Sequence, residues 1–299
     1  MKTFSPSDIS TRVFYSHMVG AVVPRPIAFV SSVSAEGKVN LSPYSFFNAV
    51  SANPPTLIFS PVNSIRDGST KNTLDNVLEH QEVVINIVNY RMVEQMSLAS
   101  TPYAKGINEF TKAGLEEAPS SIVEPPRVAE APIAFECKVK QVIALGKEGG
   151  AGNLVICEVL LMHINEGILD AEGNIEPHKL DAVGRMGGSY YCRASGEAIF
   201  ETLRPLREQG MGVDQLPEAI RKSKILTGSD LAQLANIAEV PQAEIYSQEL
   251  KAPEIQQLFS AQNTNSEAIQ DEAHRMAQRL LTDNEVYKAW AVLLRAHNT

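Results

Sequence analysis

The stretch from Pro24 to Thr73 constrains the fold of this chain more than any other segment. It opens with an apolar, largely β-branched run and continues through turn chemistry into a second extended run. Pro54 and Pro55 then force an extended backbone before a third run. The pattern predicts strands at residues 27–34, 39–46 and 56–60, a turn at 35–38 and a polar, aromatic loop at 45–51.

Cations and hydroxyl groups follow the third predicted strand, immediately before a helical pattern at residues 74–80. Arg66, Lys71 and Thr73 lie in this loop. Such a combination is suited to a phosphate group. Free N–H groups at a helix N-terminus and charge-assisted hydrogen bonds both stabilise a dianion. The alternative is that Arg66 and Lys71 are solvated loop charges.

Seven segments occur in one order from about residue 18 to residue 193, and together they resemble the flavin reductase-like family, the FMN-binding split β-barrels. The segments are VPRPIAFVSSV, GKVNLSPYSFFNAVSANPPTLIFSP, KNTLDNV, EVVINIV, NEFTKAGL, PPRVAEAPIAFECKV and RMGGSYY. The resemblance implies a mainly β split barrel with Greek-key-like topology over residues 1–195. It also implies a homodimer that binds FMN at or near the subunit interface.

The resemblance assigns cofactor-binding roles to two groups of residues. The phosphate group is expected at Ser60, Arg66, Lys71, Asn72 and Thr73. The ring and ribityl chain are expected at Ser45, Phe46, Phe47, Asn48, Ala49 and Ser51. Phe46 and Phe47 are alternatively core aromatic residues, and at most one should face the flavin, because consecutive strand residues point in opposite directions.

Other polar residues of the matched region have two open interpretations. Arg25 either reaches a nucleotide or forms a structural ion pair. Gly187 and Gly188 either admit a ligand close to the backbone or allow a strand bulge. His17 and His163 are expected to be structural or surface residues.

Bulk properties exclude several classes of function. A formal net charge of −9 and a pI near 5.3 disfavour binding to nucleic acid or to an anionic membrane. No apolar run approaches the length of about 20 residues that spans a bilayer, and the first residues lack the apolar core of a signal peptide. We expect a cytoplasmic protein without a metal site, in which Cys137, Cys157 and Cys192 are buried thiols.

The remaining pattern separates a strand-rich region from a helical one. Further strands are expected at 82–88, 133–145, 153–164 and 182–193, with a short helix at 91–99 and a loop-rich segment at 100–132. Residues 196–299 are expected to form an all-α C-terminal extension that packs on the barrel, extends the dimer or covers the flavin. Its helices are predicted at 197–209, 215–223, 230–238, 242–247, 253–260, 266–281 and 284–296.

The resemblance implies an NAD(P)H:flavin oxidoreductase in which NADH or NADPH reduces FMN. Reduced flavin would then pass to a separate monooxygenase or another electron acceptor. Because hydride transfer to flavin is the chemistry of the cofactors, no catalytic residue is assigned. The alternative function is a non-enzymatic electron carrier or redox sensor whose helical extension binds a partner. A pyridoxamine-phosphate oxidase-like enzyme fits the SFFNAV and ECKV segments less well.

Overall fold

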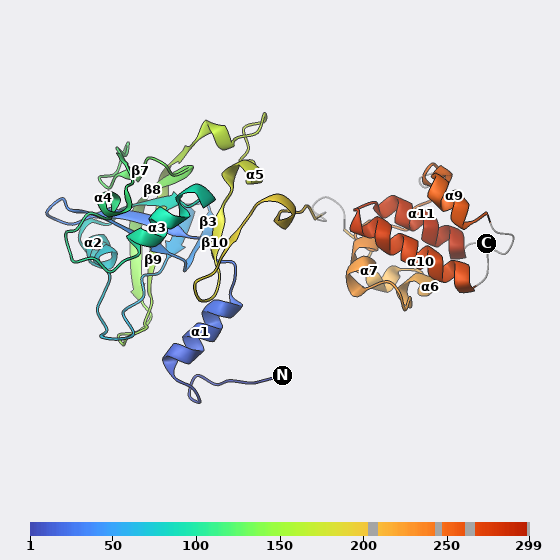
Figure 1. Ribbon diagram of the computed structural model, residues 1–299, viewed down its shortest axis with the longest axis horizontal. Helices are drawn as coiled ribbons and strands as arrows, with labels where there is room; N and C mark the ends of the chain where they lie inside the picture. Colours follow the sequence, from blue (N-terminus) through green and yellow to red (C-terminus); the bar gives the residue numbers. More distant parts are fainter. Residues whose placement is uncertain (203–208, 243–246, 261–266, 298–299) are drawn as a thin grey trace. The chain divides into compact units, whose positions relative to one another are not determined.

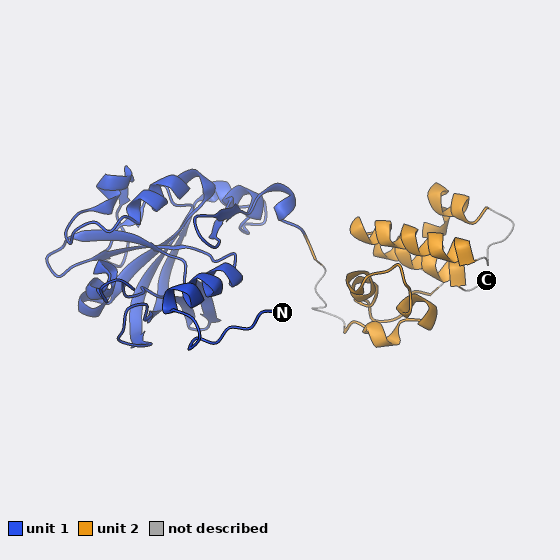
Figure 2. Cartoon of the chain, turned by 60° about the horizontal axis from the view of Figure 1, so that its bottom comes forward, with its two compact units in different colours: residues 1–200 blue, residues 201–299 orange. Residues whose placement is uncertain are grey.

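The computed structural model describes residues 1–202, 209–242, 247–260 and 267–297 (Figure 1). The chain divides into two compact units, unit 1 at Met1–Phe200 and unit 2 at Glu201–Thr299 (Figure 2). The helix predicted at 242–247, the central part of the one predicted at 197–209, and the expected start at Ser266 lie outside the described residues.

Unit 1 is built on a seven-stranded sheet in which every neighbouring pair is antiparallel. In spatial order its strands are β2 (Val39–Tyr44), β1 (Ala28–Val33), β5 (Glu82–Ile87), β8 (Ile133–Ala144), β9 (Asn153–Ile164), β4 (Pro55–Phe59) and β3 (Phe47–Ala52). Two small hairpins add β6 (Glu117–Ala118) with β7 (Arg127–Val128), and β10 (Val183–Arg185) with β11 (Tyr191–Arg193). The predicted mainly β split-barrel architecture is confirmed.

Strand β1 explains why residues 27–30 form a continuous apolar run. Ala28 and Val30 belong to one buried cluster, whereas Ile27 and Phe29 belong to another. Successive strand residues point to opposite faces, so both faces of the strand are covered. A strand buried on both faces reads as a continuous apolar run rather than an alternating one.

Two strand predictions are wrong in detail. Residues 45–51, expected to be a loop, contribute most of edge strand β3, which pairs with the free edge of β4 through a bulge between Ala49 and Ser51. The single strand expected at 182–193 is the β10–β11 hairpin. Its turn includes Gly188 at φ 59°, a backbone conformation that glycine adopts without steric cost.

Helices and 3₁₀ turns surround the sheet of unit 1. The predicted helices at 74–80 and 91–99 are confirmed, whereas helix α1 was not predicted. The helices are α1 (Thr11–Ala21), α2 (Asn72–His80), α3 (Val93–Ala99), α4 (Glu109–Ala113) and α5 (Pro177–Leu180), with 3₁₀ turns at η1 (Tyr90–Met92), η2 (Glu166–Ile168) and η3 (Gly196–Ala198).

Arg25 attaches the C-terminal end of α1 to the barrel. Its guanidinium is buried and donates hydrogen bonds to the carbonyl oxygens of Val19, Val22 and Met186, the last at 3.2 Å. Its Nε also donates to Ser45 Oγ at 3.3 Å. A cation at a helix C-terminus satisfies carbonyl groups that lack intrahelical partners. Arg25 therefore has a structural role, but its partners are carbonyl and hydroxyl oxygens and not the acid of the expected ion pair.

His163 likewise has a structural partner. Its Nε2 lies 2.6 Å from Oε1 of Glu136, a carboxylate that is fully buried. Backbone N–H groups of Ser121, Ile122 and Val123 also donate to that carboxylate. Burial alone would raise the pKa of Glu136, but these hydrogen bonds outweigh it and lower the pKa. The pair therefore ties β8 and β9 to the loop before β7.

Unit 2 is an all-helical unit with a core of its own. Its helices are α6 (Glu218–Arg221), α7 (Gly228–Leu234), α9 (Pro253–Leu258), α10 (Glu267–Thr282) and α11 (Val286–His297), with 3₁₀ turns at η4 (Val213–Gln215) and η5 (Glu249–Lys251). The helical character predicted for the extension is confirmed. Residues 199–202, however, are not helical, so the start of the helix predicted at 197–209 is wrong.

The apolar stripes of the last two helices are buried within unit 2 itself. Leu280, Trp290 and Leu293 pack with Ile220 and Leu234 in one cluster. These apolar side chains are therefore buried without a contribution from the barrel or from another subunit.

Two histidines link the middle of α10 to the C-terminal end of α11. Nε2 of His274 lies 2.8 Å from Nε2 of His297, and Nδ1 of His274 lies 2.6 Å from the hydroxyl of Ser223. Burial, and then the nearby His297, lower the pKa of His274, although Asp271 opposes them. Burial also lowers the pKa of His297. Both shifts favour the neutral imidazole.

Acid should destabilise unit 2. As the pH falls through the ordinary histidine pKa of about 6.5, the unfolded chain binds protons that the folded unit does not, so the free energy of unfolding falls. Trp290, the single tryptophan of the chain, is fully buried in this core and its fluorescence reports on the unit. We expect a lower urea midpoint at about pH 5.5 than at about pH 7.5.

The variant His297→Gln should reduce this pH dependence, whereas His178→Gln, an exposed position in unit 1, should preserve it. Equal midpoints for the unmodified protein at both pH values would contradict the interpretation.

Candidate functional site

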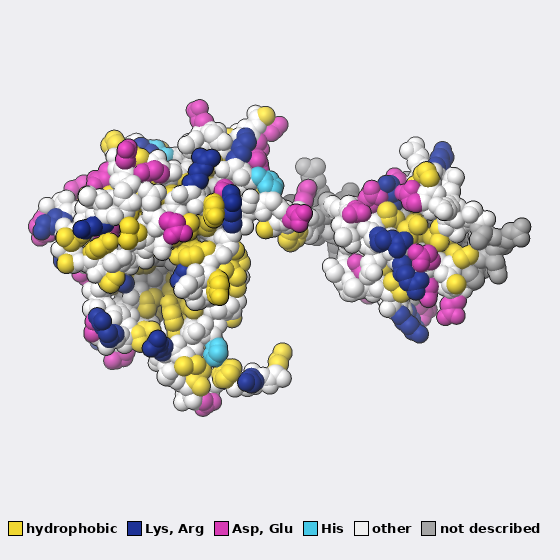
Figure 3. All heavy atoms as spheres, viewed as in Figure 1, with side chains coloured by type: hydrophobic (Ala, Val, Ile, Leu, Met, Phe, Trp, Pro, Cys, Tyr) yellow, Lys and Arg dark blue, Asp and Glu magenta, His cyan; other side chains and the backbone are white. Residues whose placement is uncertain are grey.

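A cavity of about 730 Å³ lies in unit 1 between β2, the loop at residues 62–73 and the segment after α3. A smaller space of about 240 Å³ shares part of its lining, including Tyr15, Tyr44 and Lys71. Figure 3 shows hydrophobic and basic side chains around a hollow on this unit, beside the N-terminal segment. Together the two spaces have the size of an ordinary small-molecule site.

The N-terminus of α2 forms one end of the cavity. Lys71 is the N-cap residue, and its carbonyl oxygen accepts from the N–H groups of Leu74 and Asp75. The N–H groups of Asn72 and Thr73 have no hydrogen-bond partner among the described residues. Unpaired N–H groups in the first turn of a helix, combined with the helix dipole, favour an anion.

A buried hydrogen-bond chain holds this helix end in place. The hydroxyl of Thr73 donates to Oδ1 of Asn40 at 2.7 Å, and Nδ2 of Asn40 donates to Oε1 of Glu109 at 2.9 Å. The other oxygen of Glu109 accepts from the backbone N–H of Leu41 at 2.9 Å. The chain thereby connects α2, β2 and α4. Burial raises the pKa of Glu109, and the bonds from Leu41 and Asn40 oppose that effect.

Tyr44 supplies a polar group without a partner. Its hydroxyl is buried and makes no hydrogen bond of normal geometry, although the hydroxyls of Thr73 and Ser42 are close enough to affect its ionisation. Burial outweighs their effect and raises the pKa of Tyr44 to about 12. A buried hydroxyl without a partner costs free energy, so a group that bonds to Tyr44 would be stabilised there.

The two cations of the loop before α2, Arg66 and Lys71, are not equally available to a ligand in the cavity. Arg66 lines it, but its side chain is 91% exposed and pairs with Asp67 at 3.2 Å. Asp67 also accepts from the N–H and hydroxyl of Ser69, and these bonds, chiefly that of the Ser69 hydroxyl, lower its pKa. Because Asp67 offsets the charge of Arg66, Lys71 is the cation of the lining that has no acidic partner.

With Arg66 and Lys71 included, the structure brings seven predicted residues to this region and leaves four outside it. Asn72 and Thr73 line the large space, while Ser45, Phe46, Ser60 and again Lys71 line the small one. Phe47 instead packs against the barrel core. Asn48, Ala49 and Ser51 lie on the exposed edge strand β3 and are outside the lining of both spaces.

The glycines of the RMGGSYY segment have structural roles in this chain. A Cβ on Gly187 would lie 3.1 Å from Cα of Gly20 in α1, so the glycine allows the hairpin to approach that helix closely. Cys137 and Cys157 are fully buried, and burial raises the pKa of Cys137 to about 12. Cys192, in contrast to the expectation, is only half-buried.

Sequence analysis missed Tyr15, Asn40, Tyr44 and Glu109. Asn40, Ser42 and Tyr44 line the cavity at a spacing of two residues along β2, which is the period of one strand face. That periodicity was a usable signal. The pairing of Asn40 with Glu109 joins positions 69 residues apart and depends on the tertiary fold.

The described residues contain neither a metal site nor a membrane-spanning helix. No group of three or more His, Cys, Asp or Glu side chains among them could hold a metal ion. None of the described helices combines the length and the apolar character needed to cross a bilayer.

Comparisons with known proteins match part of this chain. A sequence model of the flavin reductase like domain matches residues 19–179. An uncharacterized protein of Aquifex aeolicus is 38% identical over 183 residues, which are 61% of this chain and 91% of that protein. YwrF of Bacillus subtilis, also uncharacterized, is 33% identical over 208 residues, covering 69% of this chain and all of YwrF.

Two solved structures are each 30% identical to this chain. Nitrilotriacetate monooxygenase component B from Bacillus cereus has a TM-score of 0.62, with 68% of this chain and 98% of that one covered. The 2-nitrobenzoate 2-nitroreductase NbaA of Pseudomonas fluorescens has a TM-score of 0.61, with 70% and 99% covered. These relatives therefore account for about two thirds of this chain.

Replacement of Glu109 should destabilise unit 1. In Glu109→Gln the new amide places a donor opposite the donors of Leu41 or Asn40, and a buried group without its partner costs about 1–3 kcal/mol. For a unit of this size each kcal/mol lowers Tm by about 2–4 °C, which calorimetry resolves. Glu116→Gln, at an exposed carboxylate in the same region, is the matched control. Equal Tm values for the two variants would exclude the network as a support.

Proposed function

The chain belongs to the flavin reductase-like family, and on that premise we propose that it binds FMN and reduces it with NADH or NADPH. The observation that carries the proposal is the cavity at the N-terminus of α2, where Lys71 stands beside the unpaired N–H groups of Asn72 and Thr73. That arrangement suits the phosphate of FMN, which carries about −1.5 to −2 charges near neutral pH. Arg66 contributes less, because Asp67 already pairs with it.

The remainder of the lining suits the ribityl chain and the ring. The hydroxyls of Ser45, Ser60 and Tyr44 can bond to oxygen and nitrogen atoms of the ligand, and the buried hydroxyl of Tyr44 has no competing partner. Phe46 provides an apolar wall, and its ring lies 6.3 Å from that of Tyr15, edge to face. These side chains would orient the ring and exclude water on this side.

When bound, the flavin accepts a hydride from the nicotinamide and supplies the redox chemistry itself. The chain's residues are proposed to bind and orient, so no side chain is assigned as acid or base. Lys71 and the α2 N–H groups would neutralise the phosphate. The Thr73–Asn40–Glu109 chain would keep that helix end in position.

The fate of the reduced flavin is proposed from the two relatives with 30% identity. One is a component of a monooxygenase, and the other is a nitroreductase. We propose that this chain supplies reduced flavin to a separate monooxygenase. We also propose a cytoplasmic location, because three cysteines without a disulfide suit a reducing compartment.

Purified protein, FMN and NADH or NADPH test the activity directly. We expect steady-state oxidation of the nicotinamide, measured by its absorbance, that depends on added FMN. If bound FMN is instead reduced by an artificial donor and never by NADH or NADPH, the electron-carrier or redox-sensor function replaces the reductase.

Removal of the Lys71 ammonium should weaken the binding of FMN but not that of riboflavin. A hydrogen bond to a charged group contributes about 1.5–3 kcal/mol, so Lys71→Ala should raise the Kd for FMN by roughly 10- to 100-fold. Lys140→Ala, at a cation that pairs with Glu158 outside the cavity, should leave both ligands unaffected. Flavin fluorescence measures the two Kd values. An equal loss for FMN and riboflavin would remove Lys71 from the phosphate site.

We further propose a homodimer through the barrel, because the strands near the flavin cavity expose apolar side chains. Val50 on β3 and Leu160, Leu161 and Met162 on β9 are between 37% and 53% exposed. An interface there would bury them and would bring Asn48, Ala49 and Ser51 close to a flavin bound by the partner.

Sedimentation should therefore give twice the chain mass of 32.6 kDa at micromolar concentration. Leu160→Asp should shift the protein toward monomer, because it would place an unpaired charge in the interface. A monomer in the unmodified protein would contradict the proposal.

A further inference from the structure

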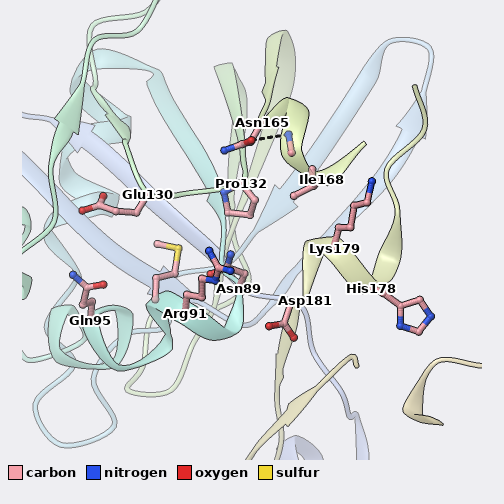
Figure 4. Close-up of a pocket in the computed structure, with 12 residues that line it drawn as sticks. Asn89, Arg91, Gln95, Glu130, Pro132, Asn165, Ile168, His178, Lys179 and Asp181 are labelled. Carbon is pink, nitrogen blue, oxygen red and sulfur yellow. Dashed lines mark hydrogen bonds between the residues drawn. The ribbon is translucent and has the colours of Figure 1, made fainter. Parts of the chain in front are cut away.

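A second cavity, of about 650 Å³, lies in unit 1 at the other end of α3 from the flavin cavity. The flavin cavity is lined by the segment that follows α3, from Ala99 to Tyr103, whereas the second cavity is lined by residues at the start of α3 and before it. The two linings share no residue. Figure 4 shows the second cavity between η1 and α3 on one side and the η2–α5 region on the other.

Two polar groups in this cavity have no partner. Oδ1 of Asn89 is buried and accepts no hydrogen bond. The guanidinium of Arg91 makes no hydrogen bond or ion pair with any described residue. Asn89 and Arg91 lie next to each other in the centre of Figure 4, below Pro132. The site therefore presents a buried acceptor without a donor beside an exposed cation that is free to bind an anion.

The other charged groups of the lining already form hydrogen bonds. Asp181 accepts two hydrogen bonds from the guanidinium of Arg193, at 2.7 and 2.9 Å. The ammonium of Lys179 donates to the carbonyl oxygen of Leu169 at 2.5 Å, and Glu130 accepts from the backbone N–H of Glu116 at 3.1 Å. Of these four charged side chains, Arg91 is the one without a hydrogen bond among the described residues, while Lys179 and Glu130 keep charges that no ion pair offsets.

We propose that this cavity binds a small oxyanion that carries a hydroxyl group, such as a hydroxycarboxylate or a phosphate ester of a polyol. The planar fork of Arg91 matches a carboxylate or a phosphate in a bidentate manner. The hydroxyl of the ligand would donate to Oδ1 of Asn89, which removes the cost of that buried acceptor.

The lining disfavours a flavin or another nucleotide at this place. Its apolar members are Met92, Pro132 and Ile168, and none of the lining residues is Phe, Tyr or Trp. A planar ring would thus have only the imidazole of the exposed His178 on which to stack. The site is also independent of the proposed flavin reductase activity, because its residues are not those of the flavin cavity.

Calorimetric titration of the full chain with three probes tests the proposal. L-malate provides a carboxylate with a hydroxyl, succinate provides carboxylates without one, and glycerol 3-phosphate provides a phosphate with hydroxyls. We expect malate or glycerol 3-phosphate to bind, and malate to bind more tightly than succinate. The stronger of the two binders identifies which oxyanion the site prefers.

Variants connect the binding to the two unpaired groups. Arg91→Gln should raise the Kd of the probe that binds by roughly 10- to 100-fold, since it removes a charge-assisted hydrogen bond. Asn89→Ala should abolish the preference for malate over succinate. Arg12→Gln, at an exposed arginine outside both cavities, should change nothing.

Calorimetric melting of each variant confirms that it is folded, and FMN binding should be unchanged in all three. The absence of binding by every probe at millimolar concentration would overturn the proposal. Binding that Arg91→Gln and Asn89→Ala leave unchanged would overturn it as well.

Discussion

The buried carboxylate of Glu109 is the interaction on which the candidate site depends. It fixes the backbone of β2 through Leu41 and the side chain of Asn40, and Asn40 in turn accepts from Thr73 in the first turn of α2. Without this chain, the N–H groups at the start of α2 and the side chain of Tyr44 would have no common support. A short α4 helix far along the chain thus positions a site that is formed mainly by residues 40–73.

The strands were predictable because their apolar residues are buried on one or both faces. Residues 133–145 and 153–164 were expected as strands, and β8 and β9 occupy almost the same ranges. The predictions failed where local pattern does not decide the structure. Strand β3 forms because its backbone pairs with the edge of β4. Helix α1 is completed by Arg25, which binds the carbonyl oxygens at its end.

The candidate site was predictable in part for a similar reason. Lys71, Asn72 and Thr73 lie at a helix start, and a helix start is a local feature. Glu109 and Tyr15 reach the same place through tertiary structure, and no local pattern in the sequence marks them. The helical character of residues 267–297 was predicted, but the residues that α10 and α11 pack against within unit 2, such as Ile220 and Leu234, lie far away in the sequence, and no local pattern reveals that packing.

Hydrogen exchange measured by mass spectrometry, with and without FMN, tests the location of the site most directly. Backbone N–H groups that become bonded to a ligand or shielded by it exchange more slowly. The structure predicts FMN-dependent protection in residues 40–44, 62–73 and 99–103, with unit 2 and the cavity around Arg91 unchanged. Protection confined to unit 2 or to the Arg91 cavity, with residues 62–73 unaffected, would contradict the placement of FMN at the N-terminus of α2.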